Sequence, residues 1–161
     1  MKLTATEDLD LPADRAFALL TDTPYFERQL LRRGIEVTRT AEGAGPEDLR
    51  WQVAYKPVPQ IDGADLWIVE HAPPGRLVMG AKSGGFTLDL VAEVTALSRR
   101  QCRLSVKAEL SASGLRNTAA LAALRLKAPA IGKTFSEQVG RVARDAERRA
   151  RDRETAQATS E

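Results

Sequence analysis

The fold is decided by the last third of the chain, about residues 115–152, which reads LRNTAALAALRLKAPAIGKTFSEQVGRVARDAERRARD. Apolar side chains recur there at intervals of three and four residues, which keeps them on one stripe of an α-helix. Pro129 lies within the stripe and predicts a bend, because a proline ring clashes with the carbonyl one turn earlier. We predict one long, bent helix whose stripe another part of the chain must cover. The stripe consists of Leu121, Leu124, Ala128, Ile131, Phe135, Val139, Val142 and Ala146.

The chain that precedes this helix is mostly strand-like. In residues 86–96 and 102–110, apolar and polar side chains alternate on either side of a turn at residues 98–101. One apolar and one polar face indicate an antiparallel sheet that is covered on one side only. Further strands are predicted at residues 2–11, 35–41, 49–56, 66–71 and 77–82.

Two short helices are predicted between the first strand and the rest of the sheet. The first begins near Pro12, and the second is expected to have Thr23 as its cap, Pro24 at its first position and Gly34 after its last turn. The predicted fold class is therefore α+β. A curved antiparallel sheet of about seven strands, with two short helices, wraps around the long C-terminal helix.

The composition excludes several classes of protein. The length of 161 residues suits one domain, which we place at residues 1–153, and the polar segment 154–161 is expected to be a disordered tail. A net charge of +2 does not indicate nucleic acid, and no apolar run approaches the ~18 residues needed to span a bilayer. With a single cysteine and no signal-peptide pattern, we expect a cytoplasmic protein without nucleic-acid partners or membrane insertion.

Arginines concentrate at the C-terminal end of the predicted long helix. Acidic residues are interspersed with them, so our interpretation is a solvated face with pairs such as Asp145–Arg149 and Glu147–Arg151. The alternative is a weak anionic partner at this end. The arginines are Arg141, Arg144, Arg148, Arg149, Arg151 and Arg153.

Three parts of the chain resemble the START-like superfamily, also called SRPBCC or Bet v 1-like. They are the strand-to-helix entry LPADRAFALLTD at residues 11–22, the turn VEHAPPGRLV at residues 69–78, and the ending of two strands and a long helix. The likeness covers about residues 1–150 and is greatest to the bacterial polyketide cyclase/dehydrase and lipid-transport-like branch. It implies a helix-grip fold, with an elongated apolar cavity between the curved sheet and the last helix.

A search for catalytic groups finds no complete set. His71 is the only histidine, and its neighbour Glu70 would point to the opposite face of a strand. Cys102 lies on the apolar face of its strand, where a cysteine usually acts as a small hydrophobe. Gly84–Gly85 is explained by a tight hairpin rather than by phosphate binding. The sequence therefore predicts no catalytic residue, no metal site and no cofactor.

Aromatic side chains are scarce, at 5% of the chain, and Trp51 and Tyr55 share one face of a predicted strand with Val53. They form either packed core or a cavity wall, in which the Tyr55 hydroxyl would orient a ligand. The cavity implied by the resemblance supplies the candidate ligand-binding residues. These are Trp51, Val53, Tyr55, Trp67, Met79, Phe86, Leu88, Leu90, Leu104, Val106, Leu121, Leu124 and Ala128.

Three functions are compatible with these observations, and we give them from the most to the least favoured. The first is binding of a small apolar molecule, such as a lipid, an isoprenoid quinone or a polyketide, without covalent catalysis. The second is a cyclase, aromatase or dehydratase acting on a polyketide-like substrate, with Tyr55, Glu70 and His71 as the available polar groups. The third is a protein-interaction module, as in the co-chaperones of the superfamily that the chain resembles.

Overall fold

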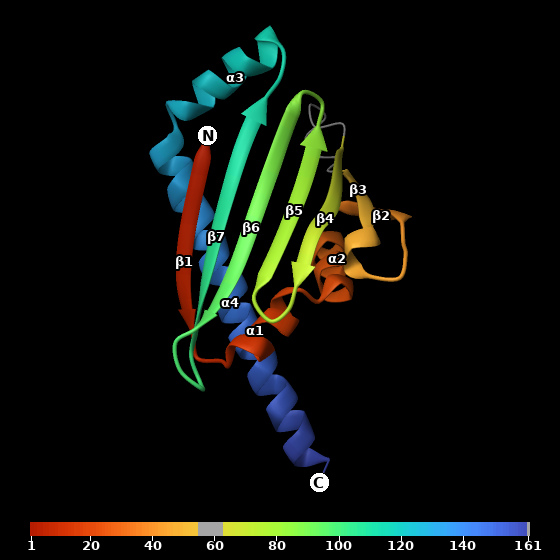
Figure 1. Cartoon of the computed structure of the whole chain (residues 1–161), viewed down its shortest axis with the longest axis vertical. Helices are drawn as coiled ribbons and strands as arrows, with labels where there is room; N and C mark the ends of the chain where they lie inside the picture. Colours follow the sequence, from red (N-terminus) through yellow and green to blue (C-terminus); the bar gives the residue numbers. More distant parts are fainter. Residues whose placement is uncertain (55–62, 161) are drawn as a thin grey trace.

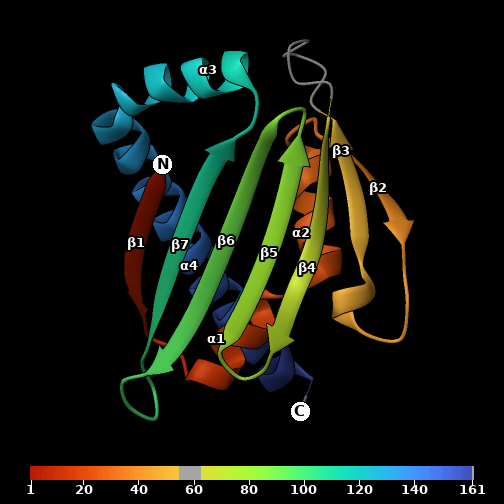
Figure 2. The ribbon, with the colours of Figure 1, turned by 45° about the horizontal axis from the view of Figure 1, so that its top comes forward.

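The structure is a computed structural model that describes residues 1–54 and 63–160. Seven antiparallel strands of this part form one sheet in the order β1-β7-β6-β5-β4-β3-β2 (Figure 1). The sheet curves around the C-terminal helix (Figure 2), which confirms the predicted α+β helix-grip fold. The strands are β1 (Lys2–Leu9), β2 (Glu36–Ala41), β3 (Arg50–Ala54), β4 (Ala64–Ala72), β5 (Arg76–Ser83), β6 (Phe86–Ala96) and β7 (Cys102–Ala112).

The two longest strands show why the sheet is covered on one face only. In β6, Leu90 and Ala92 are partly buried on the helix side, whereas Asp89 and Glu93 are exposed on the other side. Strand β7 pairs with β6 in a register that places Ala108 opposite Leu90, so that apolar side chains meet across the strands. This alternation leaves the outer face of the sheet polar, as the sequence predicts.

The second helix starts one residue earlier than predicted. Asp22, rather than Thr23, is the cap, because its carboxylate accepts a hydrogen bond from the Tyr25 N–H at 3.2 Å. Gly34 follows the last turn of this helix with φ of 78°, a conformation that favours glycine, as predicted. The helices are α1 (Ala13–Leu20), α2 (Thr23–Arg32), the short 3-10 helix η1 (Pro46–Asp48), α3 (Leu115–Arg125) and α4 (Ala128–Thr159).

The last third of the chain is broken rather than bent. A long C-terminal helix is present, as predicted, but it begins at Ala128, and α3 runs in a different direction (Figures 1 and 2). Pro129 lies in the first turn of α4, where its missing N–H costs little. In a continuous helix it would leave the carbonyl of Arg125 without a donor and clash with it. The prediction of one continuous helix is therefore wrong at this position.

Helix α4 has 32 residues and continues to Thr159. It thus passes through most of the segment 154–161 that the sequence suggests is disordered. Glu154 pairs with Arg15 of α1 at 2.5 Å, and the hydroxyls of Thr155 and Thr159 donate to carbonyls one turn earlier. Once a helix is nucleated, each further residue adds a hydrogen bond at small cost, which explains the extension of this polar end.

The core lies where α4 crosses β1 and β7. Ala143 and Ala146 have no exposed surface, and their small side chains allow the helix to lie close to the sheet. Val142, which the sequence assigns to the buried stripe, is 47% exposed because Ala143 takes the inward position. The sheet contributes Ala5, Leu9, Cys102, Leu104 and Val106 to this core.

Candidate ligand-binding cavity

A cavity of about 360 Å³ lies beside this core, between the inner face of the sheet and the helices. Strands β3 to β7 form one wall, and helices α1, α2 and α4 form the other. Phe17 of α1, Phe26 of α2 and Phe135 of α4 project onto it from the three helices. The walls are almost entirely hydrocarbon, which is the chemistry of a site for an apolar molecule.

Six of the thirteen candidate residues are brought together by this cavity. They come from four strands, and each points to the inner face because of the two-residue period of the strand. Trp51 is 2% exposed and closes the side of the cavity at β3. The six are Trp51, Met79, Leu88, Leu90, Leu104 and Val106.

Trp67 lies on the outer face of the sheet. Its indole ring covers Gly80 of β5, where an added Cβ would lie 2.4 Å from the ring atom Cε2. The guanidinium carbon of Arg50 lies 5.9 Å from the centre of the indole ring. The register explains this position, because Trp67 pairs with Arg50 and Gly80, whereas its neighbour Leu66 lines the cavity.

The other candidates do not line the cavity for different reasons. Val53 and Phe86 alternate in phase with Trp51 and Leu88, but they lie nearer the ends of their strands. Tyr55 lies outside the described residues. The break after Arg125 turns the first part of the predicted long helix away from the cavity, and this removes Leu121 and Leu124. Ala128 is the first residue of α4 and lies about two turns before Phe135, where the α4 lining of the cavity begins.

Several cavity residues escape the sequence prediction. Leu66, Ile68 and Leu77 could be found from strand alternation, since they share a face with candidate residues that line the cavity. Phe17, Phe26 and Gln138 carry no such signal. Phe135 and Val139 lie on the predicted apolar stripe of the long helix, but the stripe does not mark them as cavity residues. Their positions depend on how the helices pack on the sheet, which the helical period alone does not specify.

His71 lines the cavity, and a bulge in β4 explains its orientation. The pairing with β5 slips between Ile68 and Glu70, so that Val69 is the extra residue and His71 points inward. Glu70 points outward and accepts a hydrogen bond from Arg76 at 3.2 Å, so the predicted opposite orientation is confirmed. The ring of Phe17 lies 5.4 Å from the imidazole. The imidazole nitrogens make no hydrogen bond to any residue of the described ranges.

Trp51 is held in place by a carboxylate of α2. Its indole N–H donates to Oε1 of Glu27 at 2.7 Å, and Nε of Arg39 donates to the same oxygen at 2.6 Å. Burial acts to raise the pKa of Glu27, but the hydrogen bonds from Arg39 and Trp51 outweigh it and lower the pKa. This charged contact joins α2 to β2 and β3 at the side of the cavity.

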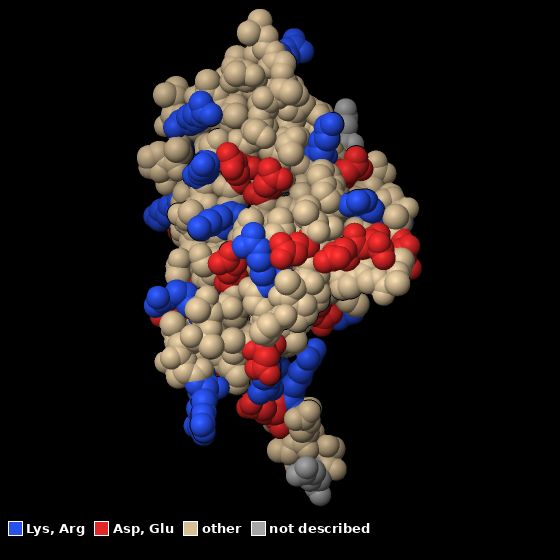
Figure 3. Space-filling view, in the orientation of Figure 1, with Lys and Arg blue, Asp and Glu red and all other residues tan. Residues whose placement is uncertain are grey.

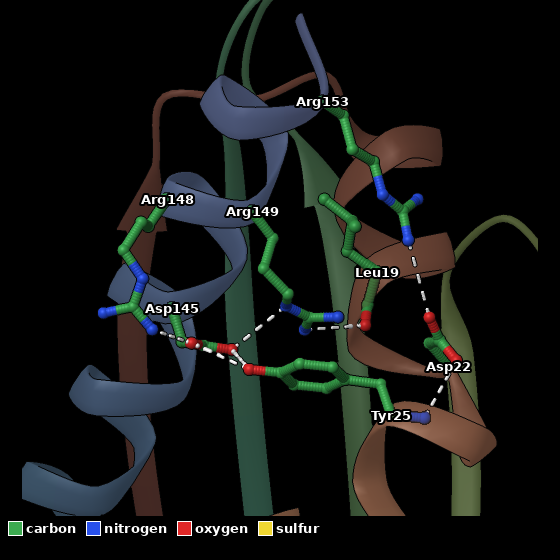
Figure 4. Close-up of polar contacts among 7 residues, drawn as sticks. All are labelled: Leu19, Asp22, Tyr25, Asp145, Arg148, Arg149 and Arg153. Atoms are coloured by element: carbon green, nitrogen blue, oxygen red, sulfur yellow. Dashed lines mark hydrogen bonds and ion pairs between the residues drawn. The ribbon is translucent and has the colours of Figure 1, made fainter. Parts of the chain in front are cut away.

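A second polar contact joins α2 to α4 (Figure 4). Tyr25 donates its hydroxyl hydrogen bond to Asp145, and Arg149 lies over the tyrosine ring with its guanidinium carbon 3.6 Å from the ring centre. Arg149 also donates to the Leu19 carbonyl at 2.9 Å and to Asp145 at 3.0 Å. None of the α2 side chains is fully buried. The polar contacts of Tyr25 with α4 and of Glu27 with β2 and β3 therefore help to hold α2 on the rest of the protein.

The arginines at the C-terminal end are largely paired within the protein. Asp145 and Arg149 form the predicted pair at 3.0 Å. Glu147, which is 7% exposed, pairs with Arg144 at 3.0 Å rather than with Arg151. A weak anionic partner at this end stays a prediction.

The acidic side chains and Cys102 are the remaining groups with possible chemistry in the described part of the chain. Its His, Cys, Asp and Glu side chains form no group of three suited to a metal ion, and none of its helices could cross a membrane. Cys102 is fully buried, and burial, with the charges of Asp8 and Glu147, raises the pKa of its thiol. A buried thiol of raised pKa is a poor nucleophile, in agreement with its reading as a small hydrophobe.

Several solved protein structures have a fold similar to that of this chain. No protein-family model and no curated protein sequence matches the chain. Among solved structures, the Zhui aromatase/cyclase from Streptomyces sp. R1128 is similar with a TM-score of 0.69 at 13% identity, over 93% of this chain and 95% of that one. Norcoclaurine synthase from Thalictrum flavum gives a TM-score of 0.65 at 10% identity, over 93% and 96%. A conserved protein from Geobacillus kaustophilus gives 0.60 at 11%, over 92% and 96%.

These similarities confirm the helix-grip fold that the sequence resemblance implies. Sequence identities of 10–13% show a similar fold, but they do not show a shared ligand or reaction.

Proposed function

We propose that the protein binds a small apolar molecule in the cavity between the sheet and helices α1, α2 and α4, without covalent catalysis. The observation that carries this proposal is the cavity itself, which has about 360 Å³ of space and nearly continuous hydrocarbon walls. A space of this kind leaves its lining without packing partners, so retaining it costs stability unless a ligand fills it.

The size of the cavity narrows the ligand class. Ligand pockets range over roughly 300–1,000 Å³, and this one lies near the lower limit. A compact molecule, such as a ring-containing isoprenoid or a folded polyketide-like compound, fits such a space.

A second candidate function is a cyclase-type reaction on a polyketide-like substrate. The observation that favours it is His71, an imidazole directed into the cavity with no hydrogen-bond partner within the described residues. A histidine in an apolar pocket can transfer a proton to or from a bound substrate. The cavity lining also includes the polar residues Thr21, Asp22, Thr23 and Gln138, and the amide of Gln138 could orient a carbonyl group.

The binding proposal can be tested with the uncharged fluorescent probe N-phenyl-1-naphthylamine. In a Trp67→Phe variant, Trp51 is the remaining tryptophan, and energy transfer from it reports a bound probe, whose place the following substitutions determine. Two neighbouring residues of β6 provide a matched pair, since Ala92 faces the cavity and Val91 faces outward.

We expect Ala92→Phe to weaken probe binding at least about tenfold by filling the cavity, and Val91→Phe to change it less than about twofold. Equal effects of the two substitutions, or no energy transfer from Trp51, would contradict the proposal. Thermal melting of each variant confirms that it is folded.

A further inference from the structure

Helix α3 has an apolar face that no other described part of the chain covers. Leu115 is 91% exposed, and Leu126, in the turn that follows the helix, is 86% exposed. Ala119 and Ala122 are also exposed and lie between them on the same side, because their spacing follows the helical period. Leu121, on the opposite side, is only 5% exposed and attaches the helix to the protein. The helix therefore has two apolar sides, and only the side of Leu121 packs against another described part of the chain.

The charge around this face has a single sign. Residues 110–136 contain four of the 24 Lys and Arg residues of the chain and none of its 22 Asp and Glu residues. The four are exposed and form no ion pair with any described residue. On the face shown in Figure 3, the end of the molecule formed by α3 carries basic side chains among uncharged ones and no acidic side chain. The four are Arg116, Arg125, Lys127 and Lys133.

The exposed leucines and the positive charge together indicate which kind of partner binds this face of α3. A second copy of the chain packed on α3 would bring the same unpaired cations together, and like charges disfavour that contact. An anionic lipid surface matches both features, because leucines enter the acyl boundary while arginine and lysine reach phosphate groups. Helix α3 also forms one end of the molecule, opposite the C-terminus (Figure 1), so it can lie on a surface.

We propose that α3 and the turn at Leu126 and Lys127 dock on an anionic phospholipid surface, with Leu115 and Leu126 at the interface. The docking is peripheral, since the segment is neither long nor apolar enough to cross a bilayer. It does not depend on whether the cavity holds a ligand.

The test is flotation of the full chain with vesicles of phosphatidylcholine alone and of equal parts phosphatidylcholine and phosphatidylglycerol. Two double variants address the two features: Leu115→Asp with Leu126→Asp, and Arg116→Glu with Lys127→Glu. Their matched controls carry the same changes elsewhere, namely Val69→Asp with Leu97→Asp, and Arg99→Glu with Arg100→Glu. All these side chains are exposed, so the variants keep the fold.

We expect the protein to float with the phosphatidylglycerol vesicles, and each α3 double variant to lose at least about tenfold in partitioning. Each control should stay within about twofold of the unmodified protein. Failure to bind these vesicles, or equal losses in the controls, would overturn the proposal. So would a dimer in sedimentation velocity that Leu115→Asp with Leu126→Asp dissociates, because α3 would then bind a second copy.

Discussion

The hydroxyl of Tyr25 lies 2.8 Å from Oδ2 and 3.0 Å from Oδ1 of Asp145, 120 residues further along the chain (Figure 4). Burial, followed by this hydrogen bond, raises the pKa of the Tyr25 phenol above its ordinary value of 10.0. The contact fixes the start of α2 against α4. Because Phe26 of α2 and Val142 of α4 both line the cavity, the contact also fixes the distance between two of its walls.

Tyr25→Phe should lower the free energy of unfolding by about 1 kcal/mol, since it removes this hydrogen bond and keeps the ring under Arg149. A raised pKa stabilises the folded state fully below the unfolded pKa near 10.0, and this stabilisation is lost as pH rises through the folded pKa. Urea unfolding between neutral and strongly alkaline pH should therefore show a difference between protein and variant that shrinks at high pH. A constant difference would contradict the assignment.

For Glu27 we expect the opposite pH dependence of the free energy of unfolding. Its pKa lies below the ordinary 4.5, so the contribution to stability is present above that pH and is lost as pH falls through the lower folded value. Glu27→Gln should cost about 1–3 kcal/mol at neutral pH and less in acid. Unfolding curves at neutral and acidic pH measure this, and Glu109→Gln on the exposed face of β7 serves as the comparison. A cost that is independent of pH would count against the role of the Glu27 charge.

Much of the fold could be predicted from the sequence, because strand alternation directly encodes which side chains face inward. The candidate residues of β5, β6 and β7 that line the cavity follow this period. The bulge at Val69 could not be predicted, since an extra residue in a strand leaves no mark on a polar and apolar pattern. The structure places Trp67 outside the cavity, and its alternation with the cavity residue Leu66 accounts for that position.

The helical part of the site was harder to predict. Pro129 indicated an interruption, but it did not show whether the chain would bend or break. The contacts of α2, such as Tyr25 with Asp145 and Glu27 with Trp51, join residues that are distant in sequence. No local pattern encodes such pairs, so the helix wall of the cavity emerges only from the packed structure.

The position of Trp67 over Gly80 can be tested by a single methyl group. Gly80→Ala places a Cβ 2.4 Å from the indole and should cost about 1–3 kcal/mol, because the ring must move. Gly132→Ala, where no atom lies within 4 Å of the added Cβ, should instead stabilise α4 by about 0.5–1 kcal/mol. Chemical denaturation measures both. Equal effects would show that Trp67 is not packed on Gly80.

His71 distinguishes the two candidate functions of the cavity. If the site only binds apolar molecules, His71→Ala should change the affinity for N-phenyl-1-naphthylamine by less than about threefold, under about 1 kcal/mol. The reason is that the imidazole has no charged or hydrogen-bonding partner within the described residues. A hundredfold loss in a folded variant would show that the imidazole anchors the ligand and would favour the cyclase-type function.

The most direct test of the binding proposal is a crystal structure of the protein with N-phenyl-1-naphthylamine. We predict electron density for one probe molecule inside the cavity, in contact with Leu90 and Val106 of the sheet and with Val139 of α4. Probe molecules found only on the outer surface, with the side chains of the sheet and α4 packed together across the space, would contradict it.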